Sequence, residues 1–278
     1  MPNPKRRSNL TTVSFDDSAK RAPSPQRPVR SRARPLAIDA HIEPHHHAWS
    51  QFTYCASGLM QVTVTQGDLQ TTYIVPPTRA VWIPPLVQHR VVVLEDAELR
   101  TVDLDPSVTP TDWSECRVLM VSKLLRELVH ALEDSAPGKR DDAIMTLALD
   151  EMTHATIQDL GVPMPHAEHG DKRLRALCEA VLRHPAERSR LRDWVATVGA
   201  SERTVARLFR DELGTNFQHW RQQAVLAHAL PLLARGMPIS QVAAASGYAS
   251  DSAFSAMFKQ AMGQAPSRFQ GRTLPRQQ

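Results

Sequence analysis

Histidines carry the most distinctive chemistry in the first half of this chain. His45, His46 and His47 stand side by side in EPHHHAWSQFTYCASG, and His89 ends the later stretch PPLVQH. Residues two apart on a β-strand point to the same face, so His45 and His47 would share a face and His46 would point the other way. If His89 lies on a neighbouring strand, it completes a set of three imidazoles.

Three neutral imidazoles can bind a divalent transition metal such as Zn, Ni, Co, Mn or Fe and leave coordination positions open for water or an effector. The same side chains can instead hydrogen-bond an organic effector in a pocket without metal. A third alternative is that they are structural or solvated. The sequence alone leaves these three alternatives open.

A second chemistry is repeated in the last third of the chain. SERTVARLFRDELG, from Ser201, and SDSAFSAMFKQAMG, from Ser250, lie 49 residues apart and align without a gap. Each opens with a serine suited to N-capping a helix, and each ends at a glycine, Gly214 or Gly263, suited to a C-cap. A short helical stretch and a glycine turn precede each segment, in LRDWVATVG and ISQVAAASG. This is the helix-turn-helix pattern, and its duplication predicts double-stranded DNA as a partner.

The apolar face of each segment predicts which side meets DNA. We expect the first segment to bury Val205, Leu208, Phe209 and Leu213 and the second to bury Phe254, Met257, Phe258 and Met262. The opposite faces carry Glu202, Arg203, Ala206, Arg207 and Arg210 in the first, and Asp251, Ser252, Ser255, Ala256 and Lys259 in the second.

Arginines on the exposed face of the first segment are the expected base-reading residues. Arg203 and Arg207 could each pair with a guanine edge, a contact worth about 1–3 kcal/mol of discrimination. Arg210 and Lys259 are better placed for phosphates, which fix position without reading sequence. The second segment has fewer long polar side chains, so we expect it to contribute less base readout.

Strand-like and helical patterns divide the chain. Between residues 36 and 105, short runs rich in Val, Thr and Tyr alternate with Gly and Pro, which predicts a small all-β sandwich or barrel. Residues 117–134 and 141–160 have the spacing of amphipathic helices. Residues 161–171 are typical of an interdomain linker, and the chain beyond them is helical in pattern.

Charge separates along the same boundaries. Residues 1–35 have a net charge of +7, residues 36–170 of −11 and residues 171–278 of +8. The basic last third is the natural partner of a polyanion, and the Arg- and Pro-rich first 35 residues predict a disordered tail. Three separated cysteines favour a reducing compartment, and from the sequence we expect neither a signal peptide nor a membrane-spanning segment.

The repeated segments, together with WRQQ and the stretch ISQVAAASGYASDSAFSAMFKQAMGQAPSRF, resemble the AraC/XylS family of transcription regulators over about residues 171–270. The resemblance implies two helix-turn-helix units joined by a long helix. Val195 stands where this family usually has a small alanine. Pro231 falls inside the expected joining helix, where proline removes one backbone hydrogen bond and could kink the helix.

The histidine stretch resembles the two motifs of cupins, which are small β-barrels, over roughly residues 36–108. His45, His47, Gln51 and Gly58 follow the spacing of the first motif, with Gln51 in place of the usual Glu. His89 follows the second motif, although Leu86 replaces its usual Gly. Many AraC-like regulators carry such a domain in front. The resemblance implies an effector or metal site of His45, His47, Gln51 and His89, of which the three histidines are the narrower metal set.

These patterns predict a two-domain α+β chain with an N-terminal cupin-like β-barrel, a helical connector and a C-terminal all-α domain with two helix-turn-helix units. The expected divisions are a disordered tail (1–35), an effector-binding domain (36–108), a connector that could dimerise (109–170) and a DNA-binding domain (171–278). The candidate dimer face lies around Leu124, Leu125, Leu128 and Leu132, which could equally pack on the chain's own barrel.

The function expected is that of a non-enzymatic, sequence-specific transcription regulator whose DNA binding responds to a small molecule or metal. The alternatives are a metal-dependent cupin enzyme fused to a DNA-binding domain, which Gln51 in place of Glu disfavours, and a constitutive DNA-binding protein with a vestigial barrel. Expected partners are DNA, the effector, a second copy of the chain and, for an activator, RNA polymerase. No membrane is expected, and the location is the cytoplasm, on the nucleoid.

Overall fold

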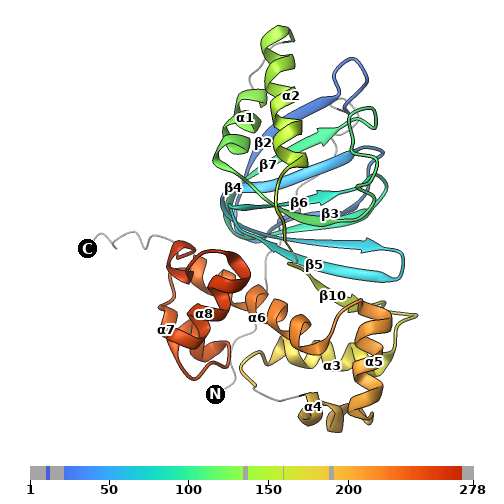
Figure 1. The fold of residues 1–278 in the computed structure, drawn as a ribbon, viewed down its shortest axis with the longest axis vertical. Coiled ribbons are helices and arrows are strands. Elements are labelled where there is room, and N and C mark those ends of the chain that lie inside the picture. Colours follow the sequence, from blue (N-terminus) through green and yellow to red (C-terminus); the bar gives the residue numbers. More distant parts are fainter. Residues whose placement is uncertain (1–10, 13–21, 134–136, 159, 188–190, 271–278) are drawn as a thin grey trace. The chain divides into compact units, whose positions relative to one another are not determined.

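The computed structural model describes residues 11–12, 22–133, 137–158, 160–187 and 191–270, and the chain forms two compact units (Figure 1). The first comprises Met1–Val62 and Val75–Asp159, and the second comprises Thr63–Ile74 and Leu160–Gln278. The segment 63–74 therefore belongs to the same unit as the C-terminal helices.

The first unit is built on a largely antiparallel sheet. Its strands are β1 (Thr11–Thr12), β2 (Val29–Leu36), β3 (Ala40–His45), most of β4 (Ser50–Gln66), β6 (Arg79–Ile83), β7 (Gln88–Leu104), β8 (Arg117–Met120) and β9 (Ile157–Gln158). They follow the order β1-β3-β7-β4-β6-β8-β9, with β2 also paired to β7. Among the described strands this path does not close on itself. The sheet-rich N-terminal domain is confirmed, but its sheet is open rather than a closed barrel.

Strand β2 corrects the prediction of a disordered tail over residues 1–35. It pairs antiparallel with β7, from Val29 opposite Leu104 to Leu36 opposite Ala97. Its sequence VRSRARPL alternates arginines with other residues, and a long arginine side chain can bury its apolar stem while its head stays polar. An Arg-rich segment can therefore pair as a strand although its composition is that of a tail. Residues 1–10 and 13–21 of the predicted tail lie outside the described residues.

Two strands are longer than the sequence indicated. β4 joins the predicted runs QFTYCASG and LMQVTVTQ, and β7 joins HRVVVLE and LRTVDL. Gly58 lies inside β4 with φ 77°, a conformation that glycine adopts without a side-chain clash. A Cβ at this position would lie 2.1 Å from the carbonyl oxygen of Asp96 in β7. The glycine thus marks a close approach of two strands and not the end of one.

Helices α1 (Lys123–Glu133) and α2 (Lys139–Thr153) form a hairpin that packs against the sheet (Figure 1). Leu125 and Leu132 of α1 are buried in the same core as Phe52, Trp82 and other sheet residues, whereas Leu124 is 49 % exposed. The first predicted helix began too early, because residues 117–120 form β8 and pair with β6. Local apolar spacing does not show that strand.

The second unit contains a two-stranded antiparallel pair and the C-terminal helices. Strand β5 (Leu69–Val75) pairs with β10 (Val162–Pro165), so the predicted linker over residues 161–171 is wrong for its first half. The helices are α3 (Lys172–Arg183), α4 (Leu191–Val198), α5 (Glu202–Leu213), α6 (Phe217–Ala234), α7 (Ile239–Ala245) and α8 (Asp251–Met262), followed by a 3₁₀ turn (Pro266–Arg268).

Helix α6 joins two separate apolar cores. Trp220, near its start, belongs to the core that also contains Val195, and Leu230, near its end, belongs to the core of α7 and α8. Val195 is 8 % exposed, so this core accommodates the larger side chain. Pro231 lies within the last turn, and the helix continues to Ala234. The joining helix predicted by the family resemblance is thus present and continuous.

The lengths of the described helices and the burial of the cysteines bear on membrane insertion and on thiol chemistry. No described helix is long and apolar enough to cross a membrane. Cys55, Cys116 and Cys178 are free thiols. Burial raises the pKa of Cys55 and of Cys116 to about 12 and that of Cys178 further still. Thiols of such high pKa are weak nucleophiles, which agrees with a structural role.

Candidate nucleic-acid interface and effector site

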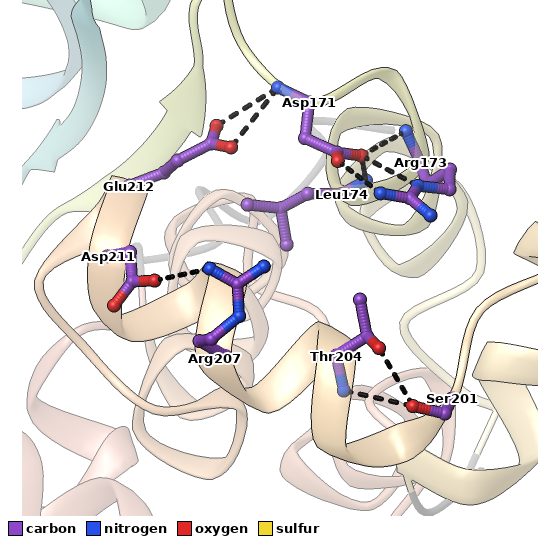
Figure 2. Close-up of polar contacts among 8 residues, drawn as sticks. All are labelled: Asp171, Arg173, Leu174, Ser201, Thr204, Arg207, Asp211 and Glu212. Atoms are coloured by element: carbon purple, nitrogen blue, oxygen red, sulfur yellow. Dashed lines mark hydrogen bonds and ion pairs between the residues drawn. The ribbon is translucent and has the colours of Figure 1, made fainter.

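Helices α5 and α8 begin and end as the repeat predicts. The Ser201 hydroxyl accepts a hydrogen bond from the backbone N–H of Thr204 (Figure 2), and Ser250 does the same for Ala253. Gly214 and Gly263 close the helices in the left-handed conformation, with φ of 63° and 72°. The two segments therefore fold as equivalent, independently capped helices.

Aromatic side chains hold each capped helix in place. The ring centroid of Phe209 lies 5.6 Å from that of Phe217 and 5.7 Å from that of Trp220. In the second helix-turn-helix the corresponding contact joins Phe258 to Phe269, with centroids 5.2 Å apart. The predicted apolar faces are buried, except that Met257 is only partly so.

The turn that precedes α8 is closely packed. Gly247 has φ 77°, and a Cβ there would lie 2.5 Å from the carbonyl oxygen of Ala186. This position therefore needs glycine for both its conformation and its neighbour.

The predicted DNA-facing residues lie on the open sides of these helices. Eight of the ten are exposed, and Ala206 and Ser255 are partly buried, in the set Glu202, Arg203, Ala206, Arg207, Arg210, Asp251, Ser252, Ser255, Ala256 and Lys259. Arg207 Nη1 donates to Asp211 Oδ2 at 3.0 Å, one helical turn further on (Figure 2). The next residue, Glu212, accepts the backbone N–H of Asp171 at 3.1 and 3.3 Å.

Asp171 fastens the start of α3 beside this helix. Its carboxylate accepts the backbone N–H groups of Arg173 and Leu174 and pairs with the Arg173 guanidinium at 2.7 Å (Figure 2). These bonds to the charged form lower the pKa of Asp171 to about 2. Since Glu212 accepts the N–H of this same residue, the C-terminal end of helix α5 is anchored to the start of α3.

In the first unit, the three predicted imidazoles meet. His45 is the last residue of β3 and lies directly opposite His89 of β7. The ring centroids of His45 and His89 are 4.2 Å apart, and those of His47 and His89 are 5.0 Å apart. The prediction that His45 and His47 lie on one strand is wrong, because β3 ends at His45 and His47 follows it. Its ring stacks on Trp49 at 4.9 Å, while His46 is exposed.

Backbone carbonyls orient all three rings. Nδ1 of His45, His47 and His89 bonds to the carbonyl oxygens of Glu43, Trp49 and Val87, at 2.8, 2.6 and 2.9 Å. A carbonyl only accepts, so each Nδ1 carries the proton and each Nε2 presents a lone pair when the ring is neutral. All three Nε2 atoms are buried, and that of His89 has no hydrogen-bond partner among the described residues. The cluster is thus a set of buried acceptors.

Burial keeps these rings neutral. Desolvation lowers the pKa of His89 to about 3, with the neighbouring His45 acting in the same direction, and it also lowers the pKa of His45 and of His47. Below pH 6.5 the unfolded chain therefore binds protons that the folded chain does not, so stability rises with pH between about 3 and 6.5.

A substitution at His89 tests this pH dependence. His89→Gln removes one of these groups. When the pH is lowered from 7.5 to 5.5, the free energy of unfolding should therefore decrease by about 1 kcal/mol more in the native chain than in the variant. Urea denaturation at the two pH values measures the difference. An equal decrease in both proteins would show that His89 is not held neutral.

Gln51 lies beside the imidazoles but is committed elsewhere. Its Nε2 donates to Asp103 Oδ1 at 3.0 Å, and Asp103 also pairs with Arg32 at 3.3 Å. A small cavity of about 20 Å³ adjoins these groups. It is lined by Arg32, Arg34, Ile42, His45, Gln51, Thr53, Val91, Leu99 and Thr101.

The imidazole cluster has only part of what a metal centre needs. Neutral imidazoles with inward lone pairs are suitable ligands for Zn or Ni. However, no three His, Cys, Asp or Glu side chains in the described part of the chain are grouped so that they could hold an ion. The arrangement therefore does not fit a metal centre as it stands.

Comparisons with known proteins agree with this division of the chain. The family model of an AraC-like ligand binding domain matches residues 32–217, and that of a helix-turn-helix domain matches residues 194–272. The HTH-type transcriptional regulator NimR of Escherichia coli K12 is 33 % identical over 229 residues, covering 81 % of each chain. The chain belongs to the AraC family of transcription regulators.

Two other proteins match either less of the chain or at lower sequence identity. The regulator RipA of Corynebacterium glutamicum is 32 % identical over 98 residues, covering 35 % of this chain and 30 % of RipA. The structure of ToxT from Vibrio cholerae matches 87 % of this chain and 97 % of that chain, at 12 % identity and a TM-score of 0.36.

Sequence reasoning missed part of both sites in this AraC-family chain. Arg32 and Arg34 fell in the predicted tail, and Asp103 carried no motif, yet these side chains border the imidazole cluster. The alternation of arginines along residues 30–34 was the available signal. Asp211, four residues after Arg207, was also visible in sequence as a spacing that permits a helical ion pair.

Proposed function

We infer that this chain, a DNA-binding transcription regulator of the AraC family with a ligand-binding domain, is controlled by an effector bound in its first unit. We propose that a small organic effector, bound at His45, His47 and His89 in the first unit, modulates its affinity for an operator. The observation that carries this proposal is the buried cluster of imidazole acceptors beside two arginines. Gln51 belongs to the lining and acts through Asp103.

We propose that the second unit binds duplex DNA through the exposed faces of α5 and α8. Arg203 and Arg207 contact base edges in the major groove, supported by Glu202, and Arg210 contacts phosphate. Ser252, Ser255 and Lys259 make the weaker contacts of the second helix-turn-helix. Support comes from the exposure of these residues on two capped helices of a basic segment.

The lining defines the chemical class of the effector. Two arginines line the cavity, Arg34 and the Asp103-paired Arg32, and their guanidinium groups suit a carboxylate or another anion. The Nε2 lone pairs of the imidazoles accept hydrogen bonds, which favours hydroxyl or amine groups on the same ligand. A hydroxylated carboxylic acid satisfies both. Because the cavity has room for about one water, such a ligand binds only if the lining moves, and that movement can couple effector binding to DNA affinity.

A panel of small hydroxycarboxylic acids, tested by thermal shift, measures this. We expect at least one acid to raise the melting temperature of the native chain and to change its affinity for operator DNA. In His45→Gln and Arg34→Gln, which change two residues of the lining, the affinity for that acid should fall about tenfold or more, because each variant loses a hydrogen-bonding or charged partner. If the acid raised the melting temperature of both variants as much as that of the native chain, this cavity would be excluded as the site.

Measuring bound metal tests the alternative that the imidazole cluster is a metal site. Tag-free protein incubated with Zn, Ni, Co, Mn and Fe salts should hold less than stoichiometric metal by elemental mass spectrometry, and His47→Ala should hold the same amount. One equivalent of metal that is lost in His47→Ala would replace the organic effector by a metal centre.

Other properties follow from this assignment as proposals. The relatives are regulators, and we infer that the chain performs no catalysis and acts in the cytoplasm, on the nucleoid. The first unit serves as the effector domain, extending the expected range 36–108 to include β2, and residues 171–270 bind DNA. Leu124, exposed on α1, marks the face for a second copy of the chain, and RNA polymerase is a partner if the protein activates.

A further inference from the structure

Recognition helix α5 carries an ion pair on its open face. Nη1 of Arg207 lies 3.0 Å from Oδ2 of Asp211, and the side chains are 61 % and 54 % exposed (Figure 2). An exposed pair of this kind contributes about 0.3–0.5 kcal/mol to helix stability. Stability is therefore a weak reason for Asp211 to stand at this position.

The neighbouring acid has a different task. Glu212 points to the start of α3, where its carboxylate accepts the backbone N–H of Asp171 (Figure 2). In the part of the chain that the structure describes, the recorded polar contact of Asp211 is the one with Arg207. Of these two consecutive acids, Glu212 therefore anchors the helix and Asp211 pairs with the arginine.

Recognition of guanine by arginine depends on the orientation of the planar guanidinium group. Two N–H groups of the guanidinium must face O6 and N7 together, and a free arginine loses rotamer entropy when it is held there. The contact with Asp211 uses one of the five guanidinium N–H donors and leaves the others available. A carboxylate one turn away can therefore fix the guanidinium while its remaining donors face DNA.

We propose that Asp211 is a positioning residue that orients Arg207 for guanine and thereby sets the sequence specificity of the first helix-turn-helix. This inference rests on the proposed DNA contact of Arg207. The aligned positions of the second unit, 49 residues on, are Ala256 and Gln260, which cannot form such a pair. The two recognition helices are thus unequal: the first holds an oriented base-reading arginine and the second does not.

Affinity for two DNA duplexes tests the inference. One duplex is selected from a random pool by the native chain, and the other has the same composition in scrambled order. Asp211→Ala should bind the selected duplex about 3- to 10-fold more weakly, because Arg207 loses its orientation. It should bind the scrambled duplex no more weakly, since a negative charge near DNA has been removed. Asp211→Asn should recover part of the loss, because its amide oxygen still accepts from Arg207.

Matched variants separate the outcomes. Gln260→Ala, at the aligned position, should leave the ratio of the two affinities unchanged, and Arg207→Ala/Asp211→Ala should lose no more than Arg207→Ala alone. Equal changes of Asp211→Ala on both duplexes, or additive losses in the double variant, would overturn the role of Asp211. An unchanged selected-duplex affinity in Arg207→Ala would instead overturn the proposed function of Arg207 itself. Melting temperatures within a few degrees of the native value confirm that each variant is folded.

Discussion

Arg207→Ala should lower the affinity of the full chain for its selected operator by about 10- to 100-fold, because a bidentate arginine–guanine contact contributes about 1–3 kcal/mol. Arg207 is exposed on α5, and truncating it removes no buried contact. Its partner Asp211 is also exposed and does not become a buried unpaired charge. Fluorescence anisotropy with a labelled duplex measures the loss.

Lys259→Ala is the matched control for this first result. It removes one exposed positive charge from α8, the helix expected to contact the backbone. We expect a loss of only a few fold that is similar on selected and scrambled DNA, with the slope of log affinity against log salt reduced by about one. If Arg207→Ala behaved in the same way on both duplexes, Arg207 would be a phosphate contact and not a base contact.

The second large effect concerns the sheet that carries the imidazoles. Gly58→Ala should lower the free energy of unfolding by about 3 kcal/mol or more, because a left-handed conformation and a clash with backbone are both unfavourable. Its Cβ would lie 2.1 Å from the Asp96 carbonyl and 2.7 Å from Ala97 Cα, and neither atom belongs to a flexible side chain. Urea denaturation followed by tryptophan fluorescence measures this loss.

Gly67→Ala separates the cost of the left-handed conformation from the cost of the clash. Gly67 has φ 58°, but a Cβ there would meet nothing within 4 Å. This variant should lose only the conformational part, about 1 kcal/mol. Equal losses in the two variants would mean that β4 and β7 are not held in close contact at Gly58.

The local signals in the sequence predicted the second unit well. Ser201 and Ser250 act as N-caps, and Gly214 and Gly263 act as C-caps, because capping depends on a few neighbouring residues. The repeat of 49 residues also located the apolar faces. Arg207 could be named for the same reason, since its exposure follows from helical spacing alone.

The parts that could not be predicted depend on pairing between distant segments. Strand β2 looked like a disordered tail because its arginines gain their partners only when β7 lies beside them. Strand β10 looked like a linker because its partner β5 is about 90 residues away in the chain. Both Arg32 and Asp103 entered the candidate effector site through such pairings. Helix α6 continues past Pro231 to Ala234.

Selection of duplexes from a random pool tests most directly the central claim that two unequal helix-turn-helix units bind DNA and the first reads bases. The native chain should enrich duplexes with two conserved sequence blocks about one helical turn apart. When Arg207→Ala is used for the selection, the block that contains a conserved guanine should be lost. The other block should remain. No enriched sequence with the native chain, or the same two blocks with Arg207→Ala, would contradict the claim.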